Sequence, residues 1–375
     1  MIKKILIAVL LVLIFIFPQK VYAEDTTIES VADMFGLEEA DRGLSQIGAD
    51  YGMEDFSLKE TALKLVTGEF DFSFSGFIKW IVRLAAGQAA DVMYIMRRIL
   101  ILILLSAVLE TVSSSFLSSG VSNMGQYVCS SVLVITVMQS FYYASETVTS
   151  AMDKITQLST TLQPIYMLIM TANGKAAKMS AAVPVMYASA SILNYMVKRL
   201  IVPCVLLAAL ITFINSMSER DVFMELADLL SCLCKWGVKL CAGGFIFVMS
   251  LIKIGVPDMA VIAGKSIKTA AEAVPVVGSL MSSAAETAAS LASSMGNSVT
   301  AAIMLFIVLM SIMPVVRLSV IMIIYKLTAA LTEPIASKRI VKCIGRAADY
   351  TAILTGIIFT AEVMFITVTA LMLAV

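Results

Sequence analysis

Histidine is absent from this chain of 375 residues, and charged residues make up only 14% of it. The absence of histidine removes the commonest metal ligand and the commonest general base. Soluble domains carry about 25% charged residues, whereas hydrophobic residues reach 59% here and the mean hydropathy is +0.93. So few polar residues cannot cover a water-soluble fold of this size. This excludes a soluble globular class and predicts that the bilayer is part of the solvent.

Other catalytic signatures are also missing. The six cysteines lie in or beside apolar and amphipathic stretches, where a thiol acts as a small hydrophobe, and a zinc site would need four thiolates brought together. The chain has no Gly-x-Ser-x-Gly elbow, and the run at 264–266 lacks the upstream glycine of a phosphate-binding loop. We therefore predict no enzyme, no cofactor and no metal, although a Ser-Lys dyad stays open. No basic tract is dense enough to indicate nucleic-acid binding.

Charge is unevenly distributed along the chain. Residues 24–71 hold 13 acidic and 3 basic side chains, a net of −10, and residues 72–375 hold 14 acidic and 21 basic, a net of +7. The acidic excess indicates a soluble N-terminal segment, and the basic excess is scattered among apolar runs.

The first 23 residues predict a cleaved secretory signal peptide. A positive start precedes an apolar run at 5–17, Pro18 breaks the helix, and residues 21–23 form a small-x-small cleavage site. An uncleaved anchor helix is the alternative, although the run is short for a membrane span. Cleavage places the acidic segment 24–76 outside the cytoplasm.

The acidic segment is expected to be small and loosely helical. Ser57 and Glu60 have the spacing of a capping box, and apolar residues follow on one helical face until Gly68 ends the helix. Aromatic residues between Phe70 and Trp80 come next. They are typical either of a stretch at the membrane interface or of a docking surface for a partner.

Apolar runs then predict an all-α, polytopic helical membrane domain over residues 77–375. Each run is near the roughly 20 residues that cross the hydrocarbon core. The runs are 99–117, 127–144, 200–217, 240–256, 299–325 and 351–375. Two less apolar stretches, 162–197 and 257–297, are rich in Ala, Ser and Gly, which suits close packing between helices.

The two small-residue stretches resemble each other. Both contain a Gly-Lys pair and, further on, a Val-Pro-Val run, at Gly174, Lys175 and Pro184 and again at Gly264, Lys265 and Pro275. Each lies between two spans, which predicts an internal duplication with units at about 120–217 and 218–325, as many transport proteins have. Chance similarity in an Ala-rich chain is the alternative.

A topology follows if each Gly-Lys stretch is a hairpin that returns to its own side. The amphipathic segments 218–239 and 326–349 then face the same compartment, and the basic residues of the second place it in the cytoplasm. The acidic segment and the C-terminus are expected outside. The basic pairs 97–98 and 198–199 then also fall outside, which counts against this topology.

Charged groups inside apolar runs are candidate functional residues because they are costly in a bilayer. They are Glu110, Arg317 and Glu362, with Lys253 near the end of another run. The alternative is a buried pair or a basic side chain that reaches the interface. The Gly-Lys turns are candidates for lining a polar path or binding anionic lipid, with ordinary solvated loops as the alternative. Pro184 and Pro275 would free backbone carbonyls of the kind that line a cavity.

The layout of nearly the whole chain resembles the stage III sporulation protein AE family of endospore-forming bacteria. The resemblance is carried by three stretches: Ile201-Val202-Pro203 leading to Met217-Ser218-Glu219, the turn Val274-Pro275-Val276-Val277-Gly278, and Tyr325-Lys326-Leu327 with Ala329, Ala330 and Pro334.

The resemblance implies a role that spacing alone does not show. Members belong to an eight-gene operon whose products sit in the mother-cell membrane around the forespore. With a forespore-membrane partner they build a secretion-like channel or feeding-tube complex that supports forespore development. It implies other proteins of this complex and the lipid bilayer as partners, leaves a homo-oligomer open, and carries over no catalytic residue. A self-contained secondary transporter, with the duplicated hairpins as its substrate site, is the alternative function.

Overall fold

The computed structural model describes residues 37–49, 53, 56–67, 74–116, 119–172, 188, 191–216, 223–254 and 298–374. Every regular element in these residues is a helix. They are α3 (Leu37–Ala49), α4 (Leu58–Thr67), α5 (Phe74–Phe116), α6 (Ser119–Ala172), the π-helix η1 (Val197–Ile201), α8 (Val202–Asn215), α9 (Met224–Ile254), α12 (Ser298–Thr332) and α13 (Lys338–Ala374). The predicted signal peptide lies outside the described residues.

The six predicted apolar runs fall on six long helices: α5, α6, α8, α9, α12 and α13. Four helical segments are long and apolar enough to cross a membrane, namely Tyr127–Pro164, Ser191–Asn215, Ala301–Thr332 and Lys338–Thr367. The helical, polytopic membrane class is thereby confirmed.

Helix α6 is longer than the sequence pattern indicated. The apolar run ends near residue 144, yet the helix continues through the polar residues 145–161 and through Pro164 to Ala172. The polar side chains fall mainly on its exposed face, while Val148, Met152 and Leu162 stay buried. The stretch at 162–197 therefore does not start a new element at residue 162.

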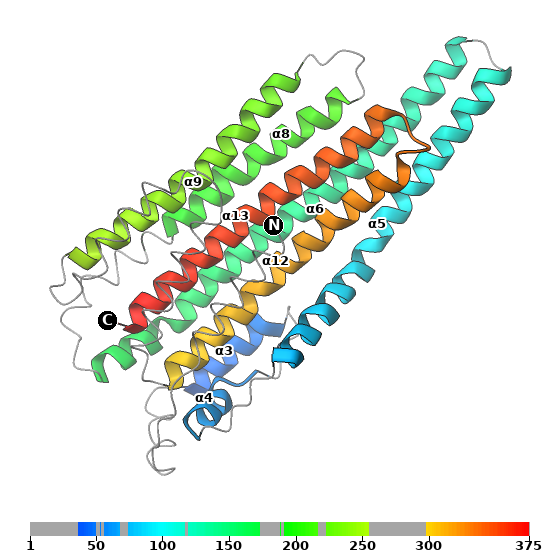
Figure 1. Cartoon of the computed structure of the whole chain (residues 1–375). Coiled ribbons are helices and arrows are strands. Elements are labelled where there is room, and N and C mark those ends of the chain that lie inside the picture. The colour runs from blue at the N-terminus through cyan, green and yellow to red at the C-terminus, as the bar shows by residue number, and fades with distance from the viewer. Residues whose placement is uncertain are drawn as a thin grey trace.

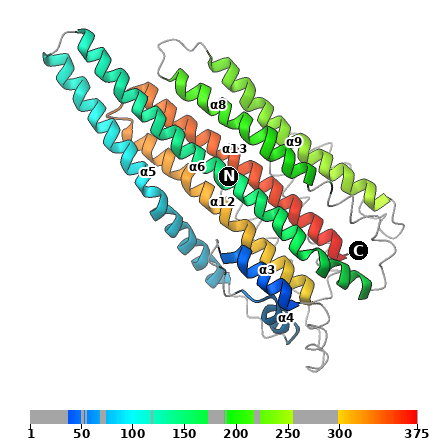
Figure 2. The same cartoon turned by 180° about the vertical axis from the view of Figure 1, so that it is seen from behind.

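The long helices form one elongated bundle with α6, α12 and α13 at its centre (Figures 1 and 2). Helix α5 packs on one flank against α6 and α12, and α8 packs on the other flank against α6 and α13, with α9 outside α8. An apolar core runs through α5, α6, α8, α12 and α13, and a smaller apolar cluster joins the start of α5 to α12. Helices α3 and α4 close one end by packing on α6 and α12.

Three helical hairpins, α5–α6, α8–α9 and α12–α13, turn at the same end of the bundle, opposite α3 and α4 (Figure 1). The described part of the amphipathic segment 218–239 and the segment 326–349 both begin near this end. Which compartment each end faces stays a prediction. The internal duplication also stays a prediction. In the first unit α6 contacts α8, and α9 of the second unit packs on α8 and α13.

The predicted helix start at Ser57 is confirmed. The Glu60 backbone N–H donates to Ser57 Oγ at 3.2 Å, and α4 ends at Thr67. The Asp41 carboxylate on α3 adds to this cap, since it accepts a hydrogen bond from the Ser57 hydroxyl at 2.9 Å. The cap therefore also joins α3 to α4.

Part of the aromatic stretch packs inside the bundle. Phe77 is buried and lies against Leu305, Val308 and Ile312 of α12, with its ring stacked on Trp80 at 5.9 Å between centroids. Phe77 thus holds the start of α5 against α12.

Candidate functional site

The structure describes only some of the predicted candidates. Six of them lie outside the described residues and stay predictions: Gly174, Lys175, Pro184, Gly264, Lys265 and Pro275. Glu110 is on α5, where the structure describes its backbone but not its side chain. Arg317 and Glu362 lie in the centre of the bundle, on α12 and α13.

Arg317 lies near the middle of the candidate span Ala301–Thr332. Its guanidinium carbon is 4.8 Å from the centroid of the Tyr143 ring on α6. Such a cation–π contact is worth about 2 kcal/mol when it is desolvated. The Arg317 Nε atom is buried and has no hydrogen-bond partner. Arg317 is therefore a cation that lies on an aromatic face, and no acidic side chain pairs with it in the described part of the chain.

Two turns further along α12, a second polar contact joins the same pair of helices. The Tyr325 hydroxyl and Ser140 Oγ on α6 form a buried hydrogen bond, and Ser140 also donates to the backbone carbonyl of Val137 at 3.0 Å. Because Ser140 and Tyr143 are three residues apart, they share a face of α6. This α6–α12 seam is polar at two levels inside an apolar core.

A tyrosine also joins α8 to α13. The Tyr350 hydroxyl lies 2.7 Å from Thr212 Oγ1. The Tyr350 ring meets Phe141 and Phe213 edge-on, with centroids 6.2 and 6.4 Å away. Edge-to-face pairs add about 0.5–1.5 kcal/mol beyond their burial. This aromatic cluster fixes α6, α8 and α13 at one level.

Glu362 is buried on α13, with 4% of its surface exposed. None of the described side chains forms an ion pair or a hydrogen bond with it, so Arg317 is not its partner. Thr351 and Thr355 share its helical face, and each satisfies its own hydroxyl by donating to a carbonyl four residues earlier. A buried carboxylate without a partner is costly. Glu362 is thus the least compensated acidic group in the described bundle.

Ion pairs at the rim attach α8 and α9 to the centre. Arg346 on α13 lies 3.2 Å from Asp228 on α9, and Lys198 in η1 pairs with Asp153 on α6. The Asn194 side-chain amide also donates to Thr156 Oγ1. Because these pairs are partly exposed, each adds at most about 1 kcal/mol, and their main effect is to set the register.

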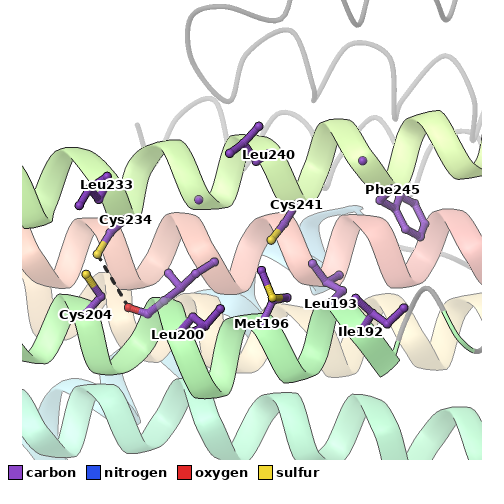
Figure 3. Close-up of a pocket in the computed structure, with 13 residues that line it drawn as sticks. Ile192, Leu193, Met196, Leu200, Cys204, Leu233, Cys234, Leu240, Cys241 and Phe245 are labelled. Atoms are coloured by element: carbon purple, nitrogen blue, oxygen red, sulfur yellow. Dashed lines mark hydrogen bonds between the residues drawn. The ribbon is translucent and has the colours of Figure 1, made fainter.

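An apolar groove of about 500 Å³ separates α8 from α9. Small side chains line the α9 wall (Cys234, Gly237, Cys241 and Gly244). Figure 3 shows the Cys234 thiol near Cys204, and it donates to the Ile201 carbonyl at 3.9 Å. Cys234 is 2% exposed, so its thiol is shielded from solvent. In the described part of the chain, no three metal-binding side chains come together.

The family model for Stage III sporulation protein AE matches residues 56–375, from just before α4 to the end of the chain. The chain belongs to this family. The resemblance predicted from the sequence is thereby confirmed. A curated relative, Stage III sporulation protein AE of Bacillus subtilis (strain 168), is 20% identical over 297 residues, which cover 78% of this chain and 74% of that protein. No solved structure matches the chain.

The family match covers Arg317 and Glu362. It also covers the three tyrosines whose contacts are described above, Tyr143, Tyr325 and Tyr350. The sequence analysis identified the two charged residues but missed Tyr143, Tyr325 and Tyr350. Their signal was a tyrosine inside or beside an apolar run, because a buried phenol hydroxyl usually has a partner. The identity of each partner required the packing of the helices.

Proposed function

We propose that this protein is a non-enzymatic membrane component of a sporulation-specific channel or secretion-like complex between mother cell and forespore. The observation that carries the proposal is the family match over residues 56–375, on a chain whose candidate membrane-crossing helices hold Arg317 against an aromatic ring and bury Glu362. Ionisable groups within such helices mark pathways, relays or functional contacts.

The dimensions of the bundle support a role within an assembly. Helix α6 has 54 residues and is about 81 Å long at 1.5 Å per residue, whereas the hydrocarbon core is about 30 Å thick. Helix α5, with 43 residues, is about 65 Å long on the same basis. Both helices extend well beyond the hydrocarbon, where other proteins can contact them.

The proposal places the protein in the mother-cell membrane around the forespore, with other stage III sporulation proteins as partners. A role other than catalysis is favoured because the chain has no histidine to act as a general base. The two candidate charged groups that the structure describes are an arginine on an aromatic ring and a buried carboxyl group, which suits a passage or a conformational element better than a catalytic pair.

Affinity purification of the tagged protein from sporulating cells tests the proposal. We expect other stage III sporulation proteins to co-purify in stoichiometric amounts, and to be lost when the same protein is purified from vegetative cells that express it alone. If the protein purifies alone and the isolated protein transports a solute into liposomes, it is a stand-alone secondary transporter and the proposal is wrong.

A further inference from the structure

The exposed face of α6 changes character along its length. Exposed residues recur every three or four positions, as expected for one helical face. The N-terminal part of this face is apolar, with Val128, Val132 and Ile135 exposed. From Gln139 onwards it becomes polar, and the exposed residues are Gln139, Tyr142, Glu146, Ser150, Asp153, Gln157 and Thr160.

Contacts with the neighbouring helical segment Ser191–Asn215 indicate how deep in the membrane the polar part of the α6 face lies. At one end of that segment, Asn194 bonds to Thr156 of α6. At the other end, the Phe213 ring lies 6.0 Å from the Phe141 ring of α6. Nineteen residues separate Asn194 from Phe213, or about 28 Å of helix, which is close to the hydrocarbon thickness of about 30 Å.

On this flank of the bundle, the segment Ser191–Asn215 is the best candidate for direct contact with lipid. Its most apolar 18-residue stretch has a mean hydropathy of 2.2, and Leu200, Leu207 and Ile214 are all about half exposed. Lys198 and Arg199 lie near its start, where long basic side chains reach the interface. If this segment crosses the hydrocarbon core, residues 142–156 of α6 lie at the same depth.

At that depth, contact between the polar face of α6 and lipid would be costly in free energy. A charged side chain costs about 2.5–3.5 kcal/mol at the centre of a membrane helix, and Glu146 is exposed with no basic partner among the described side chains. Ser150 and Gln157 are also exposed. Asp153 is neutralised by Lys198, yet its side chain is still 64% exposed.

We infer that residues 142–157 of α6 form the wall of a water-filled route at membrane depth, which takes water and small hydrophilic solutes. The inference rests on the proposed function and deepens it, because it assigns the route to one helix face. The apolar part of the same face, from Val128 to Ile135, lies beyond the level of Phe141, whose ring meets Phe213 near the end of the crossing segment.

Cysteine accessibility tests this inference in the full-length protein. Single cysteines replace Ser150 and Gln157 in a chain whose six native cysteines are changed to alanine. Each variant is reconstituted in phospholipid vesicles, and a charged methanethiosulfonate reagent is supplied on both sides of the membrane. Leu200→Cys and Leu207→Cys are the controls, since both positions are about half exposed on the proposed lipid surface of the segment Ser191–Asn215. If the cysteine-free chain does not accumulate, the wild-type background is used and its own labelling is subtracted.

We expect Ser150→Cys and Gln157→Cys to react at least about tenfold faster than the two controls. The thiolate is the reactive form, and each unit by which lipid raises a thiol pKa lowers the thiolate fraction about tenfold. Equal, slow reaction at all four positions would show that lipid or protein covers the polar face. Fast reaction at Leu207→Cys would show that α8 is not at membrane depth. Either result overturns the inference, and neither bears on whether the protein joins a complex.

Discussion

Ser140 on α6 and Tyr325 on α12 share a hydrogen bond in the interior of the bundle, although 185 residues separate them in sequence. Tyr325 is only 1% exposed, so its hydroxyl has no access to bulk solvent. The pair therefore sets how the α5–α6 hairpin and the α12–α13 hairpin meet.

Removal of the Tyr325 hydroxyl should weaken this junction. We expect Tyr325→Phe to lower the free energy of unfolding in mixed micelles by about 0.6–2 kcal/mol, the range for hydrogen bonds between membrane helices. Ser140→Ala should have little further effect in the Tyr325→Phe background. Additive losses in the double-mutant cycle would show that the two side chains do not interact.

The contact between Arg317 and Tyr143 should depend on the aromatic ring and not on its hydroxyl. Tyr143→Phe keeps the ring face and should change stability by less than about 0.5 kcal/mol, whereas Tyr143→Leu leaves the Arg317 cation without its partner and should cost about 2 kcal/mol. The measurement is the free energy of unfolding in micelles. Equal effects of the two substitutions would exclude a cation–π contact.

Glu362 is expected to act through its ionisable group. Glu362→Gln keeps the shape of the side chain, so the protein should accumulate in the membrane at the wild-type level while heat-resistant spores become fewer. Glu333→Gln is the matched control, because Glu333 is exposed in the turn between α12 and α13 and should sporulate normally. A Glu362→Gln strain that sporulates like the wild type would leave Glu362 with a packing role only.

Gly43 on α3 permits a close approach to α6. A Cβ atom at this position would lie 2.6 Å from Thr161 Cγ2, so Gly43→Ala should destabilise the docking of α3 by about 1–3 kcal/mol, as overpacking does. Thr161→Ser removes that methyl group and should restore stability in the double variant. The rate of proteolysis within α3 measures the effect, and failure of Thr161→Ser to rescue would argue against this contact.

The apolar periodicity of the sequence was sufficient to predict which segments are helices, since six runs of about span length fall on α5, α6, α8, α9, α12 and α13. The end of α6 was not predictable from the same signal. Glu146, Asp153 and Gln157 lower the local hydropathy, yet they occupy only the exposed face, and Val148 and Met152 continue the buried one.

Candidate residues were predictable by chemical type, but their partners were not. Arg317 and Glu362 were identifiable because charges are rare in apolar runs, and an ion pair between them was a reasonable alternative. The structure instead has Arg317 on Tyr143, and no described side chain is paired with Glu362. The register between helices far apart in sequence decides such partners, and no local pattern encodes it.

The heat-resistant spore count of a strain that lacks this gene tests the central claim most directly. We predict that engulfment proceeds, that sporulation is blocked afterwards, and that heat-resistant spores reappear when the wild-type gene is restored. A deletion strain that forms heat-resistant spores at the normal frequency would contradict the proposed role in the complex between mother cell and forespore.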